Sequence, residues 1–436
     1  MDHSFDQFPR YDNPPQDERV RGLLCSDNKG KMQIIAPEMA MVDPSPIRKS
    51  TARSITSLPP EETSSVCAIP GYYGLPTVVH EALKHEAQVA LATEKPGEYV
   101  KATGAQIHQL CQSHVSFEAS FAQELTITPL DKKNDEDQIL RAVESFTMRR
   151  IQDRLDETLH IPPLPEAARR IIELQQNPNH DLQDLVRIIE TDPSISAKIM
   201  SWANSAMYSR GQPSKTLSDA IMRVLGFDLV FNMALGMAIG ATLSLPKDQI
   251  RGACPYWVEA VYRAAAMEGL AHQIRAQDRP EPGTCYLAGL LSNFGTLVLG
   301  HVFPPQYETI CRLREANPQL SQSMVDEYVL ELSREVVAAT LFELWELPDE
   351  VVTAVRYQNL PDYHGDDEVF AHLLAIANQI VDQPMTAESP LSIDLETTQI
   401  ADELGISEAN LNDVATTIVG SQAEFWGLAQ GMTTTG

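Results

Sequence analysis

Residues 161–240 constrain the fold most, because signals for several helices follow one another there with short breaks between them. Asp192 precedes Pro193, so a side-chain acceptor stands at a helix N-cap and a proline at the first helical position. Apolar residues then recur at every fourth position and form one stripe along that helix. They are Ile195, Ile199 and Ala203. The sequence therefore predicts an amphipathic helix that packs on neighbouring helices.

More helices are predicted on both sides of this one. Asp181 is a second N-cap, and apolar residues repeat with helical spacing over residues 182–189. Gly226 ends a short helix over residues 217–225, as glycine often does one position past a helix. Residues 227–245 are nearly all apolar, so that helix must be buried. We expect an all-α core from this part of the chain.

Four short motifs in this order resemble the first half of an HDOD domain, the HD-related output domain. They are Pro162-Pro163-Leu164-Pro165, Ile188-Ile189-Glu190-Thr191-Asp192-Pro193, Ala203-Asn204-Ser205-Ala206, and Ala220-Ile221 with Leu225-Gly226. The resemblance continues to about residue 362. It implies a helical scaffold related to the HD metal-dependent phosphohydrolases and a non-catalytic role in signalling.

The HD phosphohydrolases hold divalent metals with histidines and aspartates on separate helices, and the metals activate water for attack on a phosphoester. Where the resemblance places the His-Asp pair, this chain has Ser292 and Asn293, which are neutral and bind a divalent metal poorly. Residues 256–260 and 354–359, where further histidines are expected, hold none. We therefore predict no metal, no cofactor and no catalytic residue.

Two other histidine motifs are expected to bind no metal. Asp181 is an N-cap, which leaves His180 as the exposed residue before it. His80-Glu81 with His85 resembles a zinc-protease motif, but the two histidines are five positions apart where that motif needs four. We expect His80 and His85 to be surface histidines.

A polar loop after the helix at residues 193–203 is the candidate interaction surface. It begins with Asn204 and Ser205 and continues to Tyr208 and Arg210. Asn and Ser at a helix end also hydrogen-bond the last carbonyls of the helix and the backbone of the following loop. We expect this structural role for Asn204 and Ser205, and a ligand or partner surface is the alternative.

The first 110 residues have β character. Residues 21–35 read as a hairpin with a turn at 27–30, and residues 88–102 read as a second hairpin. A short helix over residues 104–111 follows. The sequence therefore predicts a small α/β domain at this end of the chain.

The order of these elements is similar to part of the YbaK and prolyl-tRNA-synthetase-associated aminoacyl-tRNA deacylases. Those enzymes use a lysine on an early strand and a Gly/Ser-Pro loop to hold the aminoacyl ester. Here Arg21 stands at the lysine position, and its guanidinium cannot supply a neutral amine. The loop at residues 71–76 carries Tyr72 and Tyr73, whose bulk would fill a small pocket. We expect a recognition or packing module.

Composition sets limits on location and partners. A chain of 436 residues has room for two or three domains, and its formal net charge of −27 argues against binding nucleic acid or an anionic membrane. It contains no run of eighteen apolar residues, and its first twenty residues have no apolar segment typical of a signal peptide. Its six cysteines form no C-x-x-C pair, as expected in a reducing compartment. We expect a cytoplasmic protein.

These patterns predict a mainly α protein in which an all-α HD-like (HDOD) helical domain follows a small α/β YbaK-like domain. The expected parts are a YbaK-like domain at 1–124, a linker and connecting helix at 125–160, an HDOD domain at 161–362 and a C-terminal helical extension at 363–436. The leading hypothesis is a non-catalytic bacterial signalling or regulatory adaptor that binds a protein partner, with a small ligand between the domains as a further input. The alternatives are a divergent metal-dependent phosphohydrolase and an aminoacyl-tRNA deacylase in the N-terminal domain. The sequence identifies neither the partner nor the oligomeric state.

Overall fold

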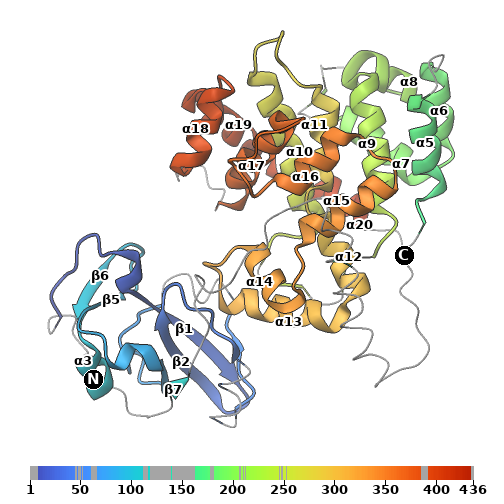
Figure 1. The fold of residues 1–436 in the computed structure, drawn as a ribbon. Helices are drawn as coiled ribbons and strands as arrows, with labels where there is room; N and C mark the ends of the chain where they lie inside the picture. Colours follow the sequence, from blue (N-terminus) through green and yellow to red (C-terminus); the bar gives the residue numbers. More distant parts are fainter. Residues whose placement is uncertain are drawn as a thin grey trace. The chain divides into compact units, whose positions relative to one another are not determined.

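The chain is divided into two compact units in a computed structural model (Figure 1). The structure describes residues 8–44, 47, 51, 53–59, 66–110, 116–117, 139, 163–176, 181–205, 208–209, 211, 213–244, 246, 249–251, 253–383 and 391–433. The sheet unit comprises Met1–Pro129, Lys247–Ala253 and Pro304–Ser333. The helical unit comprises Leu130–Pro246, Cys254–Phe303 and Arg334–Gly436. The predicted fold class, a mainly helical chain with a small sheet-containing domain first, is confirmed.

One mixed sheet organises the sheet unit. Its strands run in the order β6-β5-β1-β2-β4-β7, and β3 pairs with β1. The pairs β1–β2, β1–β3 and β5–β6 are antiparallel, whereas β1–β5, β2–β4 and β4–β7 are parallel. The bounds are β1 Arg19–Asp27, β2 Gly30–Pro37, β3 Thr56–Ser57, β4 Thr77–His80, β5 Val89–Ala92, β6 Tyr99–Ala102 and β7 Ser116–Phe117. The two predicted hairpins are confirmed as β1–β2 and β5–β6.

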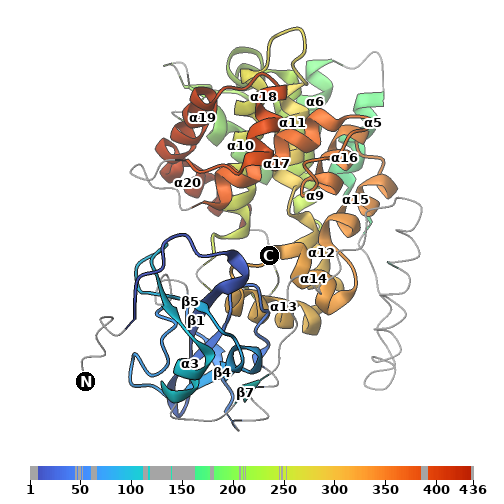
Figure 2. The same ribbon diagram turned by 60° about the vertical axis from the view of Figure 1, so that its left-hand side comes forward.

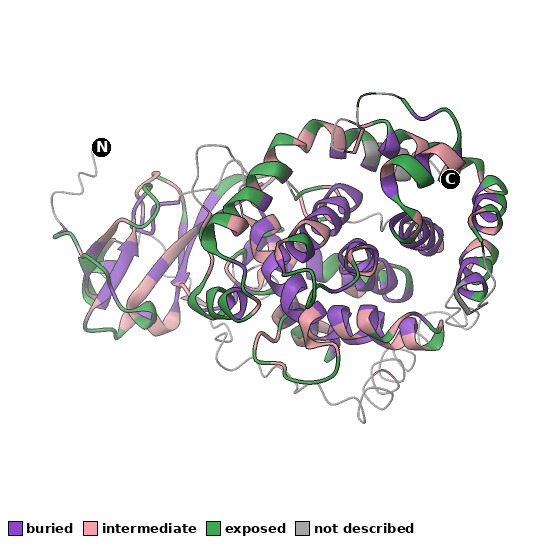
Figure 3. Ribbon diagram, turned by 90° about the horizontal axis from the view of Figure 1, so that it is seen from above, coloured by how far each residue is buried: buried purple, intermediate pink, exposed green. Residues whose placement is uncertain are grey.

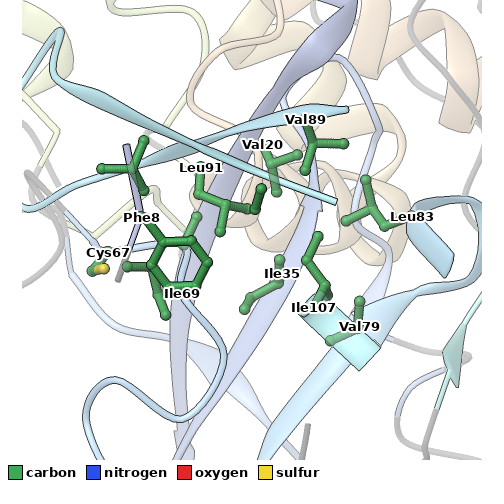
Figure 4. Packing of buried hydrophobic residues seen from close by; sticks show 13 residues of the cluster. Phe8, Val20, Ile35, Cys67, Ile69, Val79, Leu83, Val89, Leu91 and Ile107 are labelled. Atoms are coloured by element: carbon green, nitrogen blue, oxygen red, sulfur yellow. The ribbon is translucent and has the colours of Figure 1, made fainter. Parts of the chain in front are cut away.

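Both faces of this sheet are covered. Successive residues of a strand point to opposite sides, so neighbouring residues pack in different cores. On β2, Ile35 packs in a core with Ile107 of helix α3 (Gly104–Leu110), shown in Figure 4. Its neighbour Ile34 packs in a second core that includes Ala316, the last residue of α13 (Pro304–Ala316). The short 3-10 helices are η2 (Gln16–Glu18) and η3 (Glu81–Lys84). The sheet is therefore sandwiched between N-terminal elements and a segment from far along the chain.

The assignment of that segment differs from the sequence-based division of the chain into domains. The division placed residues 304–333 inside the HDOD domain, whereas α13 and α14 (Gln322–Leu330) form one compact unit with the sheet. The apolar pattern of these helices shows that they are buried, but it does not say against which element. We call residues 304–333 the insertion hairpin.

The helical unit contains the remaining helices (Figure 2). Asp181 caps α6 in a capping box with Asp184, and the Asp192 carboxylate accepts hydrogen bonds from the Ser194 and Ile195 amides at the start of α7, so both predicted N-caps are confirmed. Gly226, with φ of +88°, follows the predicted short helix. The bounds are α5 Glu166–Gln176, α6 Leu182–Glu190, α7 Pro193–Ala203, α8 Leu217–Ala220, η6 Ile221–Leu225, α9 Phe227–Gly240, α10 Tyr256–Gln273, α11 Pro282–Leu291, α12 Phe294–Val302, α15 Arg334–Leu344, α16 Asp349–Tyr357, α17 Glu368–Asp382, α18 Leu395–Glu403, α19 Glu408–Gly420 and α20 Gln422–Thr433.

The core of the helical unit lies around α10 and α11, and Figure 3 shows buried residues along most turns of the central helices. A Cβ atom at Gly289 of α11 would lie 2.6 Å from the Arg263 carbonyl oxygen of α10, so these two backbones come together only because residue 289 is glycine. Helix α9 is buried along nearly its whole length, as its apolar sequence predicts. The predicted charged linker and connecting helix of residues 125–160 lie outside the described residues, apart from residue 139.

One segment, Pro282–Val302, is long and apolar enough to cross a membrane by length and composition alone. Of its most apolar window, 83% is buried inside the fold. The segment holds two helices, α11 and α12, with a break at Ser292 and Asn293. The core of the helical unit accounts for the apolar character of this segment.

Candidate functional site

The break between α11 and α12 falls at the two positions where the resemblance places the metal-binding His-Asp pair. Ser292 is 3% exposed, and its Oγ donates a hydrogen bond to the Gly289 carbonyl oxygen at 2.8 Å. Asn293 is the N-cap residue of α12, although its side chain caps no backbone amide. Ser292 thus satisfies its hydroxyl inside its own helix and leaves Asn293 as the side chain that reaches other elements.

Asn293 belongs to a cluster that joins α12 to the start of α15. The Thr296 Oγ1 donates to Asn293 Oδ1 at 2.5 Å, and Arg334 Nη1 lies 2.8 Å from Thr296 Oγ1 and 3.4 Å from Asn293 Oδ1. Arg334 is 4% exposed, so this cationic group is held inside the fold. We call Asn293, Thr296 and Arg334 the arginine clasp. It consists of an amide, a hydroxyl and a guanidinium.

A second polar network joins Ser292 to α16 and α17. Gln358 Nε2 donates to the Ser292 carbonyl oxygen at 3.0 Å, and Asn378 Nδ2 donates to Gln358 Oε1 at 3.0 Å. Asn359 Nδ2 donates to Glu335 Oε1 at 3.0 Å. Gln358 and Asn378 tie α16 and α17 to Ser292 through neutral amides, and the carboxylate of Glu335 takes part through Asn359.

A buried arginine of α10 pairs with one carboxylate of its own helix and with one carboxylate of α17. Arg263 is 4% exposed, and its guanidinium lies 2.5 Å from Glu259 Oε1 and 2.7 Å from Asp382 Oδ1. Burial alone would lower the pKa of Arg263, but the two carboxylates outweigh it and raise that pKa. Glu259 lies in residues 256–260, where the resemblance expects the first histidine. The carboxylates there are neutralised by a protein cation.

The donor set does not fit a divalent metal. Among the residues that the structure describes, no three His, Cys, Asp or Glu side chains are placed to hold one ion. Ser292 and Asn293 are neutral, and Arg334 and Arg263 bring positive charge close to the remaining acceptors. A cation would have to displace buried arginines from their hydrogen bonds, which is costly.

Arg21, at the predicted lysine position of a deacylase, has a structural role in the sheet unit. Its Nη1 donates to the Ala316 carbonyl oxygen at 3.0 Å, and its Nη2 donates to Asn317 Oδ1 at 2.8 Å. Burial lowers the pKa of Arg21 to about 10. The guanidinium therefore holds the insertion hairpin.

The loop with Tyr72 and Tyr73 packs against the core of the sheet unit. The Tyr73 hydroxyl accepts a hydrogen bond from the Cys67 amide at 3.0 Å, and burial raises the pKa of Tyr73 to about 12. The two rings meet edge to face, with centroids 5.0 Å apart. The tyrosines fill this region with their own side chains, as their bulk suggested.

The structure places most of the candidate interaction surface in structural roles. Asn204 Nδ2 donates to the Met200 carbonyl oxygen at 2.9 Å, and its Oδ1 accepts from the Ser214 amide at 2.7 Å. Ser205 Oγ donates to the Trp202 carbonyl oxygen at 2.8 Å. The structural role predicted for Asn204 and Ser205 is therefore confirmed. Arg210 lies outside the described residues.

Tyr208, from the same loop, leads to a buried carboxyl that the sequence analysis missed. Its hydroxyl donates to Glu268 Oε2 of α10 at 2.7 Å. Burial raises the pKa of Glu268 to about 7, although the hydrogen bond from Tyr208 opposes this shift. The Tyr286 hydroxyl is buried near this carboxyl, and Glu268 contributes to a raised pKa of Tyr286. The sequence feature that could have identified this buried carboxyl is a glutamate inside the apolar run of residues 264–271.

The histidine predictions are mixed. His80 was expected at the surface, but it is 3% exposed and its Nδ1 accepts a hydrogen bond from the Ala82 amide at 3.2 Å. The surface prediction for His80 is wrong, because this residue ends a buried strand and caps η3. His85 is exposed as predicted. His180 lies outside the described residues.

The fold defines a class of protein, namely a mainly helical chain that is preceded by a small sheet-containing domain. The HDOD domain family model matches residues 161–361. A protein from Marinobacter aquaeolei VT8 that is provisionally assigned to signal transduction is 33% identical with a TM-score of 0.86, over 98% of this chain and 96% of that one. The chain belongs to the HDOD domain family.

Two further relatives show how far the likeness extends. An HDOD domain protein of unknown function from Geobacter sulfurreducens is 17% identical with a TM-score of 0.51, over 68% of this chain and 98% of that one. At this identity the likeness shows the fold alone. An uncharacterized protein of Treponema pallidum is 26% identical over 234 residues, which are 53% of this chain. The match spans 43% of the length of that relative.

Proposed function

We propose that this protein is a non-catalytic regulatory adaptor in a bacterial signal-transduction pathway. It acts in the cytoplasm by binding a protein partner. The observation that carries the proposal is the arginine clasp. At the position of a metal-binding aspartate, Asn293 accepts hydrogen bonds from Thr296 and from the buried Arg334.

The chemistry of this cluster supports a scaffold role. A phosphohydrolase of the HD class needs a metal-bound water as its nucleophile, and that water needs anionic or imidazole ligands around the metal. Ser292 instead bonds inside its helix, and Gln358 joins Ser292 to Asn378. Buried polar networks of this kind fix helices relative to one another. The signalling assignment of the Marinobacter relative supports the regulatory reading.

The test of the non-catalytic part compares the full-length chain with a Ser292→Ala/Asn293→Ala double variant. Both proteins are incubated with Mn²⁺ and assayed on bis(p-nitrophenyl) phosphate and on a cyclic dinucleotide, and their metal content is measured by elemental analysis. We expect no stoichiometric metal and no turnover above that of the double variant. A stoichiometric metal with turnover that a chelator abolishes, present in the wild type and absent from the double variant, would establish the phosphohydrolase alternative.

The partner surface is tested by site-specific photo-crosslinking. We place the surface on the polar loop that follows α7, next to which Lys215 is exposed. A photoreactive residue at position 215 should capture a discrete protein in cells, whereas the same residue at Lys95 of the sheet unit, which is 80% exposed, should not. Equal capture from both positions would mean that the loop has no special role in partner binding.

A further inference from the structure

The last helix of the chain, α20, covers part of the HDOD domain within the helical unit. Helices α18, α19 and α20 lie beyond residue 361, where the match to the family model ends. Helix α20 packs on α10 and also contacts α7, and both of those helices belong to the matched residues. We call the surface of α7 and α10 that α20 covers, which includes Tyr262, the α20 seat.

One aromatic side chain anchors α20 on this seat. Phe425 is 1% exposed, and its ring meets the ring of Tyr262 edge to face, with centroids 5.5 Å apart. Ala429, one helical turn further along, is also 1% exposed, whereas Trp426 is 43% exposed. Residues four positions apart share one face of a helix. Helix α20 therefore meets its seat along one apolar stripe with Phe425 as the anchor.

The two helices before α20 are attached by directional contacts. Asn410 Nδ2 of α19 donates to Gln273 Oε1 of α10 at 2.8 Å. Gln379 Nε2 of α17 donates to Thr397 Oγ1 of α18 at 2.7 Å. A hydrogen bond requires a particular partner at a particular place, whereas apolar burial is non-directional. An apolar anchor such as Phe425 therefore leaves room for another helix that presents a similar side chain.

The sequence of α20 gives it little stability of its own. It has 12 residues, and helices of about 12–15 residues are marginal without packing. Gly427 lies in the middle of α20, although an added Cβ there would meet no atom within 4 Å. Glycine destabilises a helix more than any residue except proline, so this position weakens α20 without a packing reason. The helix therefore depends on its seat.

We propose that the α20 seat is the binding surface for a helix of a partner protein, which replaces α20 there. The partner helix has the chemistry of α20, with little charge and one aromatic side chain at the position of Phe425. Residues 421–433 contain a single charged residue, Glu424, in a chain of net charge −27. The seat adjoins the polar loop after α7, from which the Tyr208 hydroxyl donates to Glu268 of α10. That the partner is a signalling protein rests on the proposed function, whereas the replacement of α20 does not.

A fluorescent peptide of residues 421–433, added to the full-length protein and followed by fluorescence anisotropy, tests the replacement. In the wild type the resident helix is tethered and competes at an effective concentration of about a millimolar. Phe425→Ala removes the anchor of the resident helix, so this variant should bind the peptide at least about tenfold more tightly than the wild type does. The peptide that itself carries Phe425→Ala should bind neither protein.

The matched control is Leu411→Ala. Leu411 is 3% exposed on α19, and its truncation leaves the anchor of α20 in place. This variant should bind the peptide no better than the wild type. Equal binding by Leu411→Ala and Phe425→Ala would mean that the peptide binds any loosened helical unit, and the proposal is then wrong. It is also wrong if Phe425→Ala has the circular dichroism of the wild type and binds no peptide.

Hydrogen exchange of the wild-type protein gives the answer if Phe425→Ala does not fold. The amides of residues 425–429 should exchange about a hundredfold faster than those of residues 411–418 on α19, because α20 opens while its neighbours stay closed. If the two segments exchange together, α20 leaves its seat only when the unit unfolds, and the proposal is overturned. Capture of a partner from position 215 without peptide binding would leave the proposed function standing and contradict the α20 seat.

Discussion

Asn317 Oδ1 and Arg21 Nη2 lie 2.8 Å apart across 296 positions of the sequence. Asn317 is fully buried just past α13, and Arg21 is half-buried on the first strand of the sheet. A hydrogen bond from a guanidinium to a neutral amide is stronger than one between two neutral groups. This pair therefore makes the insertion hairpin an integral part of the sheet unit.

Asn317→Ala should destabilise the sheet unit by about 2 kcal/mol or more. The substitution leaves the Val42 amide and carbonyl and one Arg21 donor without their partner, and each unsatisfied buried polar group costs about 1–3 kcal/mol. Urea denaturation followed by circular dichroism measures the change. Asn412→Ala removes an exposed amide that bonds only within its helix, and it should shift stability by less than about 0.5 kcal/mol. Equal effects of the two substitutions would contradict the role assigned to Asn317.

Arg21→Lys tests the deacylase alternative by introducing the lysine that such an enzyme uses. The substitution restores the residue type that the YbaK-like resemblance expects, but an ammonium cannot bond the Ala316 carbonyl and Asn317 Oδ1 in the same geometry. We expect a lower melting temperature and no hydrolysis of aminoacyl-tRNA by either protein. Hydrolysis by the wild type, or its appearance in the lysine variant, would mean that the sheet unit retains an editing site.

Local signals explain why much of the fold was predictable from sequence. Asp181 and Asp192 cap helices through atoms two or three residues away, so their roles are visible in a short window. The β1–β2 hairpin is likewise decided by its turn and by apolar runs on each side. The attachment of residues 304–333 to the sheet depends on the pair of Arg21 with Asn317, for which no local pattern exists.

The sequence predicted the residue types of the candidate site but not which side chains contact one another there. Ser292 and Asn293 were identified as neutral replacements for metal ligands, but nothing in the sequence paired Asn293 with Arg334. In a sequence, a buried arginine looks like an exposed one unless its partner is known. Arg263, which pairs with Asp382, is a second example. Charged side chains that are buried by tertiary contacts are the signals that single-sequence reasoning misses.

Gly295→Ala should open the clasp by steric conflict. The added Cβ would lie 2.2 Å from the Arg334 carbonyl oxygen, a distance that a backbone atom cannot relieve without moving α15. Overpacking of this kind costs about 1–3 kcal/mol. Gly427→Ala, inside α20 with nothing within 4 Å, is the matched control and should stabilise by about 0.5–1 kcal/mol because alanine is the better helix former. Thermal unfolding of the two variants should therefore move in opposite directions, and a shift of both in one direction would contradict the contact.

Glu268 should make stability fall as pH rises through neutrality. Burial raises the pKa of this carboxyl from its usual 4.5 to about 7, with Glu281 adding to the shift and the Tyr208 hydroxyl opposing it. Between these two values the folded protein binds a proton that the unfolded chain releases. The stabilising contribution is therefore complete below pH 4.5 and is lost as pH rises through about 7.

Glu268→Gln keeps a neutral side chain of the same size that can still accept the Tyr208 hydrogen bond, so this pH dependence should disappear. The measurement is the melting temperature of wild type and variant between pH 5.5 and 8.5, taken as a difference so that histidine titration common to both cancels. Glu403→Gln, at an exposed position on α18, should leave the wild-type slope unchanged. If Glu268→Gln retains that slope as well, the carboxyl is ionised in the folded protein at neutral pH, and Tyr208 then holds a buried charge in place of a neutral acid.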